Sequence, residues 1–143
     1  MFELSRRYIK TGFVFFLVGM IMGLYMIVEI YVLGSWPSQH VITAHVHVLL
    51  FGFIISIIMG VAIWMFPRPK DQKGYSPLAA EAAYWLLTLG TTVRFAAELA
   101  IAHFPGLAPL KAAIVAGSVS QMASGIIFVI NIWSRVRPVG KQT

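Results

Sequence analysis

Four long apolar runs constrain the fold of this chain more than any other feature. They occupy about residues 11–34, 39–66, 77–103 and 109–134, and each exceeds the roughly 20 residues that cross about 30 Å of hydrocarbon as a helix. Because 59% of the 143 residues are hydrophobic, the apolar surface is too large for a water-soluble core of this size. The sequence therefore predicts an all-α integral membrane protein, with residues 1–143 as a single domain of four transmembrane helices.

Segments that carry proline and glycine separate the four runs and support these boundaries. They lie at residues 34–37, 67–77 and 104–106, where proline cannot continue a helix and glycine permits a tight turn. Pro77 and Pro109 suit the first turn of a helix. Residues 13–33 are too long for the apolar core of a signal peptide, so we expect them to remain as the first transmembrane helix.

The basic residues predict the orientation of the helices. Nearly all of them lie before the first run, between the second and third, or after the fourth: Arg6, Arg7, Lys10, Arg68, Lys70, Lys73, Arg135, Arg137 and Lys141. By the positive-inside rule, both termini and the middle loop are cytoplasmic. We therefore interpret the net charge of +6 as a topology signal rather than as a nucleic-acid surface, and we expect a prokaryotic inner (plasma) membrane.

The absence of cysteine limits the chemistry that the chain can support. With no cysteine, disulfides, thiolate metal sites and the Cys-x-x-Cys-His attachment of c-type haem are all excluded. Any haem held by this chain would be bound without covalent attachment.

Several ionisable residues lie inside the apolar runs. Glu29, His45, His47, Arg94 and Glu98 fall within the spans, whereas His40, His103 and Lys111 lie near span ends. A charged side chain near a lipid-facing helix centre costs at least about 2.5 to 3.5 kcal/mol, so these groups should face protein, a cofactor or water. The predicted topology places the glutamates and histidines in the outer half of the membrane and Arg94 deeper.

Two interpretations of the charged residues stay open. Arg94 and Glu98 are four residues apart, so a simple ion pair on one helix accounts for both. Alternatively, Arg94 or Lys111 pairs with an anionic cofactor group such as a haem propionate. Glu29 is either a proton carrier or a protonated carboxyl that donates a hydrogen bond between helices.

Small residues in the first and fourth runs predict close helix packing. In membranes such residues let helix backbones approach one another. The set comprises Gly12, Gly19, Gly23, Gly117, Ser118, Ser120, Ser124 and Gly125.

The pair His45 and His47 is the strongest functional lead. Residues two apart on a helix lie about 200° apart, so these imidazoles point to opposite faces and cannot share one ion on a regular helix. The spacing also differs from the i, i+4 pairs of zinc hydrolases. Neutral imidazole is a common axial ligand of haem iron, and two facing helices can supply the two ligands.

The two faces of this predicted helix differ in bulk. On a regular helix, Gly52 and Ser56 follow His45, and both are small enough for a flat macrocycle to lie against them. The face of His47 carries larger residues such as Phe51, which suit either a pocket wall or helix packing. We therefore favour cofactor ligation by the pair over hydrogen-bonded packing.

The stretch Ala44-His45-Val46-His47-Val48-Leu49 continues through Gly52, Ile58-Met59-Gly60 and Trp64-Met65-Phe66-Pro67. It resembles a haem-bearing helix of the catalytic subunits of haem-copper oxidases and nitric oxide reductases. In that family, a His-x-His pair on the tenth helix holds two haems, one on each face. The resemblance implies that His45 and His47 are axial ligands of haem iron.

The chain also departs from that family. It has four histidines, and no second helix offers the family's His-Pro-Glu type of copper ligands, so we do not expect a complete oxygen-reducing site in one protomer. The family's subunit has about twelve helices in three arcs of four, so this chain resembles one arc, and three copies could close into a ring. Each interface would then hold a b-type haem between His45 of one protomer and His47 of the next.

Three functional interpretations follow. The leading one is a membrane b-type cytochrome that transfers electrons, or binds nitric oxide or oxygen, in a respiratory chain. Two histidine ligands on the haem iron favour electron transfer, whereas a single histidine ligand would permit oxidoreductase chemistry. The second is a haem-free accessory or assembly subunit of an oxidase. The third is a small metal or proton carrier that uses Glu29, His45 and Glu98. We expect lipid, haem, further copies of the chain and a redox protein as partners.

Overall fold

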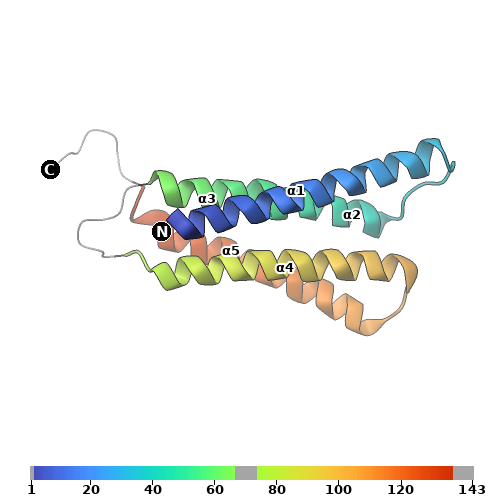
Figure 1. Cartoon of the computed structure of the whole chain (residues 1–143). Helices are drawn as coiled ribbons and strands as arrows, with labels where there is room; N and C mark the ends of the chain where they lie inside the picture. The colour runs from blue at the N-terminus through green and yellow to red at the C-terminus, as the bar shows by residue number, and fades with distance from the viewer. Residues whose placement is uncertain (1, 67–73, 137–143) are drawn as a thin grey trace.

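The computed structural model describes residues 2–66 and 74–136, and these residues form helices and short connections with no strand. The helical elements in chain order are α1 (Phe2–Tyr31), α2 (Gln39–His47), η1 (Val48–Ile55), α3 (Ser56–Met65), α4 (Pro77–His103) and α5 (Ala108–Trp133) (Figure 1). Here α2, η1 and α3 follow one another without a break and form one span. The basic residues Arg68, Lys70, Lys73, Arg137 and Lys141 lie outside the described residues.

Within the described residues, four helices are long and apolar enough to cross a membrane, which confirms the predicted all-α membrane architecture. They are Glu3–Tyr31, Gln39–Met65, Pro77–His103 and Ala108–Trp133. The first helix begins at Phe2, well before the apolar run. It extends this far because Leu4 and Tyr8 are buried against other helices, so the first turns gain packing energy although they are rich in charge.

The helix ends follow the local signals in the sequence. Ser38 and Ser76 cap α2 and α4, each accepting a hydrogen bond from the backbone N–H three residues later. Pro77 occupies the first turn of α4. Gly34 and Gly106, at the two outer connections, have φ of 66° and 103°, a conformation that glycine adopts readily.

The helices pack as an upper and a lower pair in Figure 1. Helix α1 lies along η1 and α3, α4 lies along α5, and α2 joins the two pairs through its contact with α4. Helices α1 and α4 both begin at the same end of the bundle, which we call the inner end. The connections at residues 32–38 and 104–107 lie at the opposite end, which we call the outer end. The helices stand farther apart at the outer end (Figure 1).

Glycines of α1 create the close contact with the second span. Each of three glycines faces one larger side chain: Gly12 faces Ile57, Gly19 faces Leu49 and Gly23 faces His45. A Cβ atom at Gly19 would lie 2.3 Å from Leu49 Cδ2, so only glycine fits there without movement of the leucine. The prediction that small residues let these backbones approach is confirmed.

Helices α4 and α5 are held together by small residues and by hydroxyl groups. Ser120 Oγ donates to the Leu86 carbonyl over 2.8 Å, and Ser124 Oγ donates to the Ala83 carbonyl over 2.6 Å. Gly90 lies at the same interface, where a Cβ atom would approach the backbone of α5 within 2.9 Å. These contacts fix an antiparallel register between the two helices.

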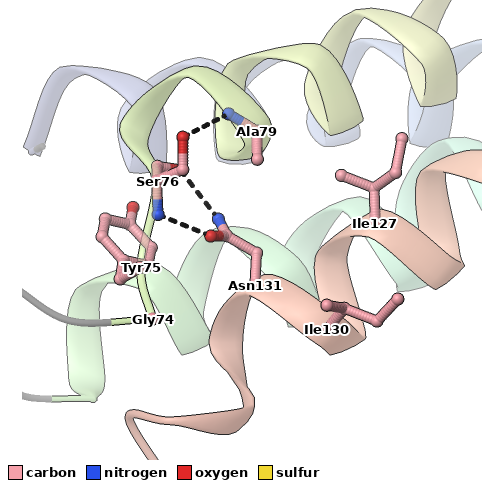
Figure 2. A pocket seen from close by; sticks show the side chains of 7 residues that line it. All are labelled: Gly74, Tyr75, Ser76, Ala79, Ile127, Ile130 and Asn131. Atoms are coloured by element: carbon pink, nitrogen blue, oxygen red, sulfur yellow. Dashed lines mark hydrogen bonds between the residues drawn. The ribbon is translucent and has the colours of Figure 1, made fainter.

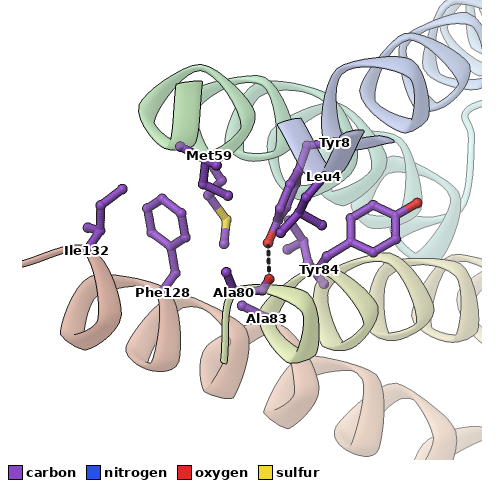
Figure 3. Packing of buried hydrophobic residues seen from close by; sticks show 10 residues of the cluster. Leu4, Tyr8, Met59, Ala80, Ala83, Tyr84, Phe128 and Ile132 are labelled. Atoms are coloured by element: carbon purple, nitrogen blue, oxygen red, sulfur yellow. Dashed lines mark hydrogen bonds between the residues drawn. The ribbon is translucent and has the colours of Figure 1, made fainter. Parts of the chain in front are cut away.

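The hydrophobic core lies at the inner end, where all four spans contribute side chains (Figure 3). Tyr8 is fully buried, and its ring meets the edge of the Tyr84 ring at a centroid distance of 5.0 Å. Its hydroxyl donates to the Ala80 carbonyl over 3.4 Å. The buried members of the cluster are Leu4, Tyr8, Met59, Ile63, Ala80, Ala83, Tyr84, Leu87, Phe128 and Ile132.

Candidate functional site

His45 and His47 of α2 flank the buried face of that helix. Val41, Ala44 and Val48 are buried, and α2 packs on α4. At about 100° per residue, His45 and His47 lie on either side of this buried stripe. Both side chains are partly exposed. The structure thus places the pair on opposite flanks of one helix, where they cannot bind a common ion.

His45 faces α1. Its ring lies against Gly23, where a Cβ atom would come within 3.2 Å of His45 Cε1. His45 Nδ1 is buried and has no hydrogen-bond partner among the described residues. A buried nitrogen left in this state costs free energy, so the arrangement suits an imidazole whose partner is supplied from outside the chain.

His47 is oriented by the helix backbone. Its Nδ1 lies 3.0 Å from the Thr43 carbonyl, and because a carbonyl only accepts, Nδ1 carries the proton and Nε2 keeps the lone pair. Metal-ligating histidines are commonly oriented in this way. The ring also stacks on Phe51, with centroids 5.5 Å apart and planes at 4°.

The bond to the backbone does not by itself identify a ligand. His103 makes the same contact with the Leu99 carbonyl at 3.0 Å, yet its side chain is exposed beside the outer connection. The contact therefore fixes which nitrogen is protonated. What separates His47 from His103 is its position within the second span, beside Phe51.

A π-helical segment begins directly after His47. The segment η1 runs from Val48 to Ile55, and such segments are frequent at functional sites. A π-helix turns less per residue than an α-helix. The regular α-helical spacing that predicted Gly52 and Ser56 on the same face as His45 therefore does not apply here. The hydroxyl of Ser56 instead donates to the Phe51 carbonyl over 3.4 Å.

The space beside Gly52 holds the ring of Phe15. A Cβ atom at Gly52 would lie 2.6 Å from Phe15 Cγ. Because α1 supplies this ring, the flat face expected beside His45 is covered within one chain. Phe15 Cβ lies almost as close, at 2.8 Å, so a macrocycle could lie against Gly52 only if α1 moved away. The assignment of Gly52 to a cofactor site stays a prediction.

The contacts between α1 and α4 give the relative depth of the polar residues. Three side-chain hydrogen bonds join the two helices with sequence offsets of 74, 72 and 73. Continuing this register outward places Gly23 level with residues 95–97. Since His45 faces Gly23, it lies at about the depth of Arg94 and Glu98.

Arg94 and Glu98 form the predicted ion pair. Arg94 Nε lies 3.0 Å from Glu98 Oε1, with the two side chains 15% and 3% exposed. The simpler interpretation of this pair is thus confirmed. The second carboxylate oxygen, Glu98 Oε2, is buried without a hydrogen-bond partner in the described part of the chain.

The remaining polar candidates are dispersed. Lys111, His40 and His103 are exposed. Glu29 is partly buried, and its Oε2 has no hydrogen-bond partner within the residues that the structure describes. Within residues 2–66 and 74–136, no three histidine, aspartate or glutamate side chains come together to hold a metal ion.

Arg135 has a role that its sequence position did not indicate. The topology argument counted it only as a positive charge after the fourth span, but its side chain is fully buried. It donates to the Ile63 carbonyl over 3.0 Å and to the Phe66 carbonyl, and its guanidinium lies 4.6 Å from the centre of the Tyr75 ring. Arg135 therefore joins the end of α5 to the end of α3, and no local pattern signals such a contact.

Side-chain amides in apolar helices were also missed. Gln121 of α5 donates to the hydroxyl of Thr91 over 3.0 Å, and both residues are buried. Asn131 pairs with the backbone of Ser76 at the start of α4. An isolated amide within an apolar run is the signal that predicts such interhelical bonds.

Comparison with known protein families identifies a relationship for this chain. The family model described as Cytochrome C and Quinol oxidase polypeptide I matches residues 3–142, which is nearly the whole chain. The match includes His45, His47 and all four spans. No curated protein and no solved structure gives a match.

Proposed function

Because this chain belongs to the cytochrome c and quinol oxidase polypeptide I family of haem-copper oxidases, we propose that it is a membrane protein that binds b-type haem through His45 and His47. Members of this family bind haem. The observation that carries the proposal is the presence of two imidazoles on opposite flanks of α2, at one depth in the membrane. One of them, His45, has a buried Nδ1 with no hydrogen-bond partner among the described residues. We place the protein in a respiratory chain of a prokaryotic inner membrane.

The two histidines have different tasks in this proposal. The Thr43 carbonyl holds the proton of His47 on Nδ1, so Nε2 is the ligating atom. His45 lies against Gly23, so its use as a ligand requires a small separation of α1 from α2. When bound, a haem with two histidine ligands supplies one-electron transfer, because both axial positions are filled.

The geometry within one chain favours an assembly of several copies. His45 and His47 point to opposite flanks of α2, while His40 and His103 are exposed at span ends. Each motif histidine therefore takes its opposing ligand from another chain. A ring of three copies, with His45 of one protomer opposite His47 of the next, supplies two imidazoles at every interface.

Lys111 is the better candidate for binding a haem propionate. Arg94 is engaged by Glu98, whereas Lys111 is exposed. Continuing the register of Ser120 and Leu86 outward places Lys111 level with about residues 95–96, close to the depth of His45. A flexible ammonium group at this depth can meet a carboxylate without breaking an existing pair.

The proposal is tested by absorption spectroscopy of the purified protein before and after reduction with dithionite. We expect a low-spin b-type spectrum that is lost or converted to high-spin in His45→Ala and in His47→Ala. His103→Ala is the matched control, because His103 makes the same backbone bond but is exposed. A protein that stays colourless after incubation with haemin overturns haem binding and favours the accessory-subunit interpretation.

The assembly has its own test. The haem-loaded protein should migrate as a trimer, and His47→Ala should remove the signature of two histidine ligands. A haem-loaded monomer, or an intact bis-histidine spectrum in His47→Ala, overturns the shared site while leaving haem binding in place.

The difference between the two histidines supports a second candidate function. Of the two, His47 is oriented by a backbone carbonyl, whereas His45 Nδ1 is buried without a hydrogen-bond partner in the part of the chain that the structure describes. A haem held by His47 alone would leave one axial position open for nitric oxide or oxygen. Carbon monoxide distinguishes the two functions: a shift of the reduced spectrum indicates a gas-binding site, and no shift indicates an electron carrier.

A further inference from the structure

A groove of about 380 Å³ lies between the start of α4 and the end of α5 (Figure 2). Tyr75, Ser76 and Ala79 line one side, and Ile127, Ile130 and Asn131 line the other. The volume is within the range of small-molecule sites. The groove is at the inner end of the bundle and is separate from the histidines of α2.

The polar groups of this groove are occupied by one another. Asn131 Oδ1 accepts from Ser76 N over 2.7 Å, and Asn131 Nδ2 donates to the Ser76 carbonyl over 2.9 Å (Figure 2). The Ser76 hydroxyl accepts from the N–H of Ala79. The surface left for an occupant is therefore mainly the side chains of Ala79, Ile127 and Ile130, which suits a hydrocarbon chain.

One positively charged group, the Arg135 guanidinium, lies next to a wall of the groove. The Tyr75 ring that forms one wall lies 4.6 Å from the Arg135 guanidinium. Every lysine and arginine of the chain except Arg94 and Lys111 belongs to the N-terminal segment, the connection before α4 or the C-terminal segment. By the positive-inside rule this end lies at the cytoplasmic leaflet, where anionic lipids gather.

We propose that the groove binds one anionic phospholipid of the cytoplasmic leaflet. One acyl chain lies along Ile127 and Ile130, and the phosphate lies beside the Tyr75 ring, within the field of Arg135. The bidentate pairing of Asn131 with Ser76 holds the two helix ends at the separation that leaves the groove open.

Phosphatidylglycerol and phosphatidylcholine are the probes for the test. The protein is exchanged into detergent with equal amounts of the two lipids, washed at high salt, and examined by mass spectrometry of the intact complex. We expect one retained phosphatidylglycerol per chain and little phosphatidylcholine. The salt wash removes lipid that is attracted only by exposed charge, because such attraction is screened.

Two variants test the location. Ala79→Leu fills the groove and should abolish retention, whereas Ala96→Leu, an exposed position of the same helix, should leave it unchanged. Ile130→Ala removes one wall of the groove and should reduce retention of phosphatidylglycerol several-fold. Val129→Ala is its control. Ile130 and Val129 are 70% and 51% exposed, so the fold tolerates both changes. Circular dichroism verifies the helix content of each variant.

Three results would overturn the proposal. Equal retention of the two lipids would remove the charge preference, and retention in both Ala79→Leu and Ile130→Ala at the wild-type level would place the lipid elsewhere. Recovery of an isoprenoid quinone in place of phosphatidylglycerol would assign the groove to a different ligand.

Discussion

The inner and outer ends of the bundle differ in how their buried polar side chains are paired. At the inner end, Ser5 Oγ donates to the Gly60 carbonyl over 2.7 Å, and Ser124 Oγ donates to the Ala83 carbonyl over 2.6 Å. These bonds tie neighbouring spans together around the core shown in Figure 3. The inner end is thus stabilised by contacts that the chain makes with itself.

Most of the unpaired buried atoms in the described part of the chain lie at the outer end. Glu29 Oε2, His45 Nδ1 and Glu98 Oε2 are buried there without hydrogen-bond partners in the described residues. At the inner end Arg7 Nε has no partner among the described residues, although the same guanidinium pairs with Glu81 through Nη2. Buried polar groups in folded proteins are nearly always paired, so exceptions call for an explanation. The difference indicates that the inner end provides stability, whereas the outer end is arranged to meet something that a single chain does not contain.

The largest effect should come from removing the central ring of the inner core. Tyr8→Ala should lower the free energy of unfolding by about 3 to 5 kcal/mol, because a large buried aromatic leaves a cavity. Tyr25→Ala on the same helix should change it little, since Tyr25 is 47% exposed. Unfolding by sodium dodecyl sulfate, followed by circular dichroism in detergent micelles, measures both changes. Equal losses in the two variants would contradict a stability centred on the inner end.

A smaller effect should follow from a methyl group added between α4 and α5. Gly90→Ala should cost about 1 to 3 kcal/mol, because the new Cβ meets backbone that cannot move aside. Gly125→Ala is the matched control, since a Cβ there meets nothing within 4 Å. It should be neutral or slightly stabilising. The same unfolding measurement applies, and a stable Gly90→Ala would show that this helix pair is looser than its contacts indicate.

The sequence predicted the spans because membrane helices depend on local properties. Apolar length, Ser76 before Pro77, and glycine at the outer turns each act within a few residues. The start of α1 at Phe2 was not predicted, because the burial of Tyr8 depends on α4, far away in the sequence. Local sequence signals thus predict where the helices lie, whereas contacts between residues far apart in the sequence determine how far α1 extends.

The candidate site was predicted less completely. The opposed directions of His45 and His47 and the pair of Arg94 with Glu98 follow from helix geometry alone, and both are present. The π-helical segment after His47 breaks the regular period that linked His45 to Gly52. Apolar side chains give no signal that distinguishes this segment from an ordinary α-helix.

The burial of Arg135 has a similar origin. Positive charge near a span end predicts orientation, and this rule does not depend on whether the side chain is exposed. The backbone carbonyls that bind Arg135 come from Ile63 and Phe66, and every residue has such a carbonyl. Only the packing of α3 against α5 determines which carbonyls are left for the guanidinium.

The smallest effect on stability is expected at His45, and it gives the sharpest test of the comparison between the two ends. In the haem-free protein, His45→Ala should change the free energy of unfolding by less than about 1 kcal/mol, because the gain from removing an unpaired buried nitrogen offsets the lost packing. Val41→Ala on the same helix is the control and should cost more, since Val41 is apolar and buried. Haemin should then stabilise the wild type but not His45→Ala. A haem-free His45→Ala protein that loses as much stability as Tyr8→Ala would show that His45 is a packing residue, and that the outer end is completed by the chain itself.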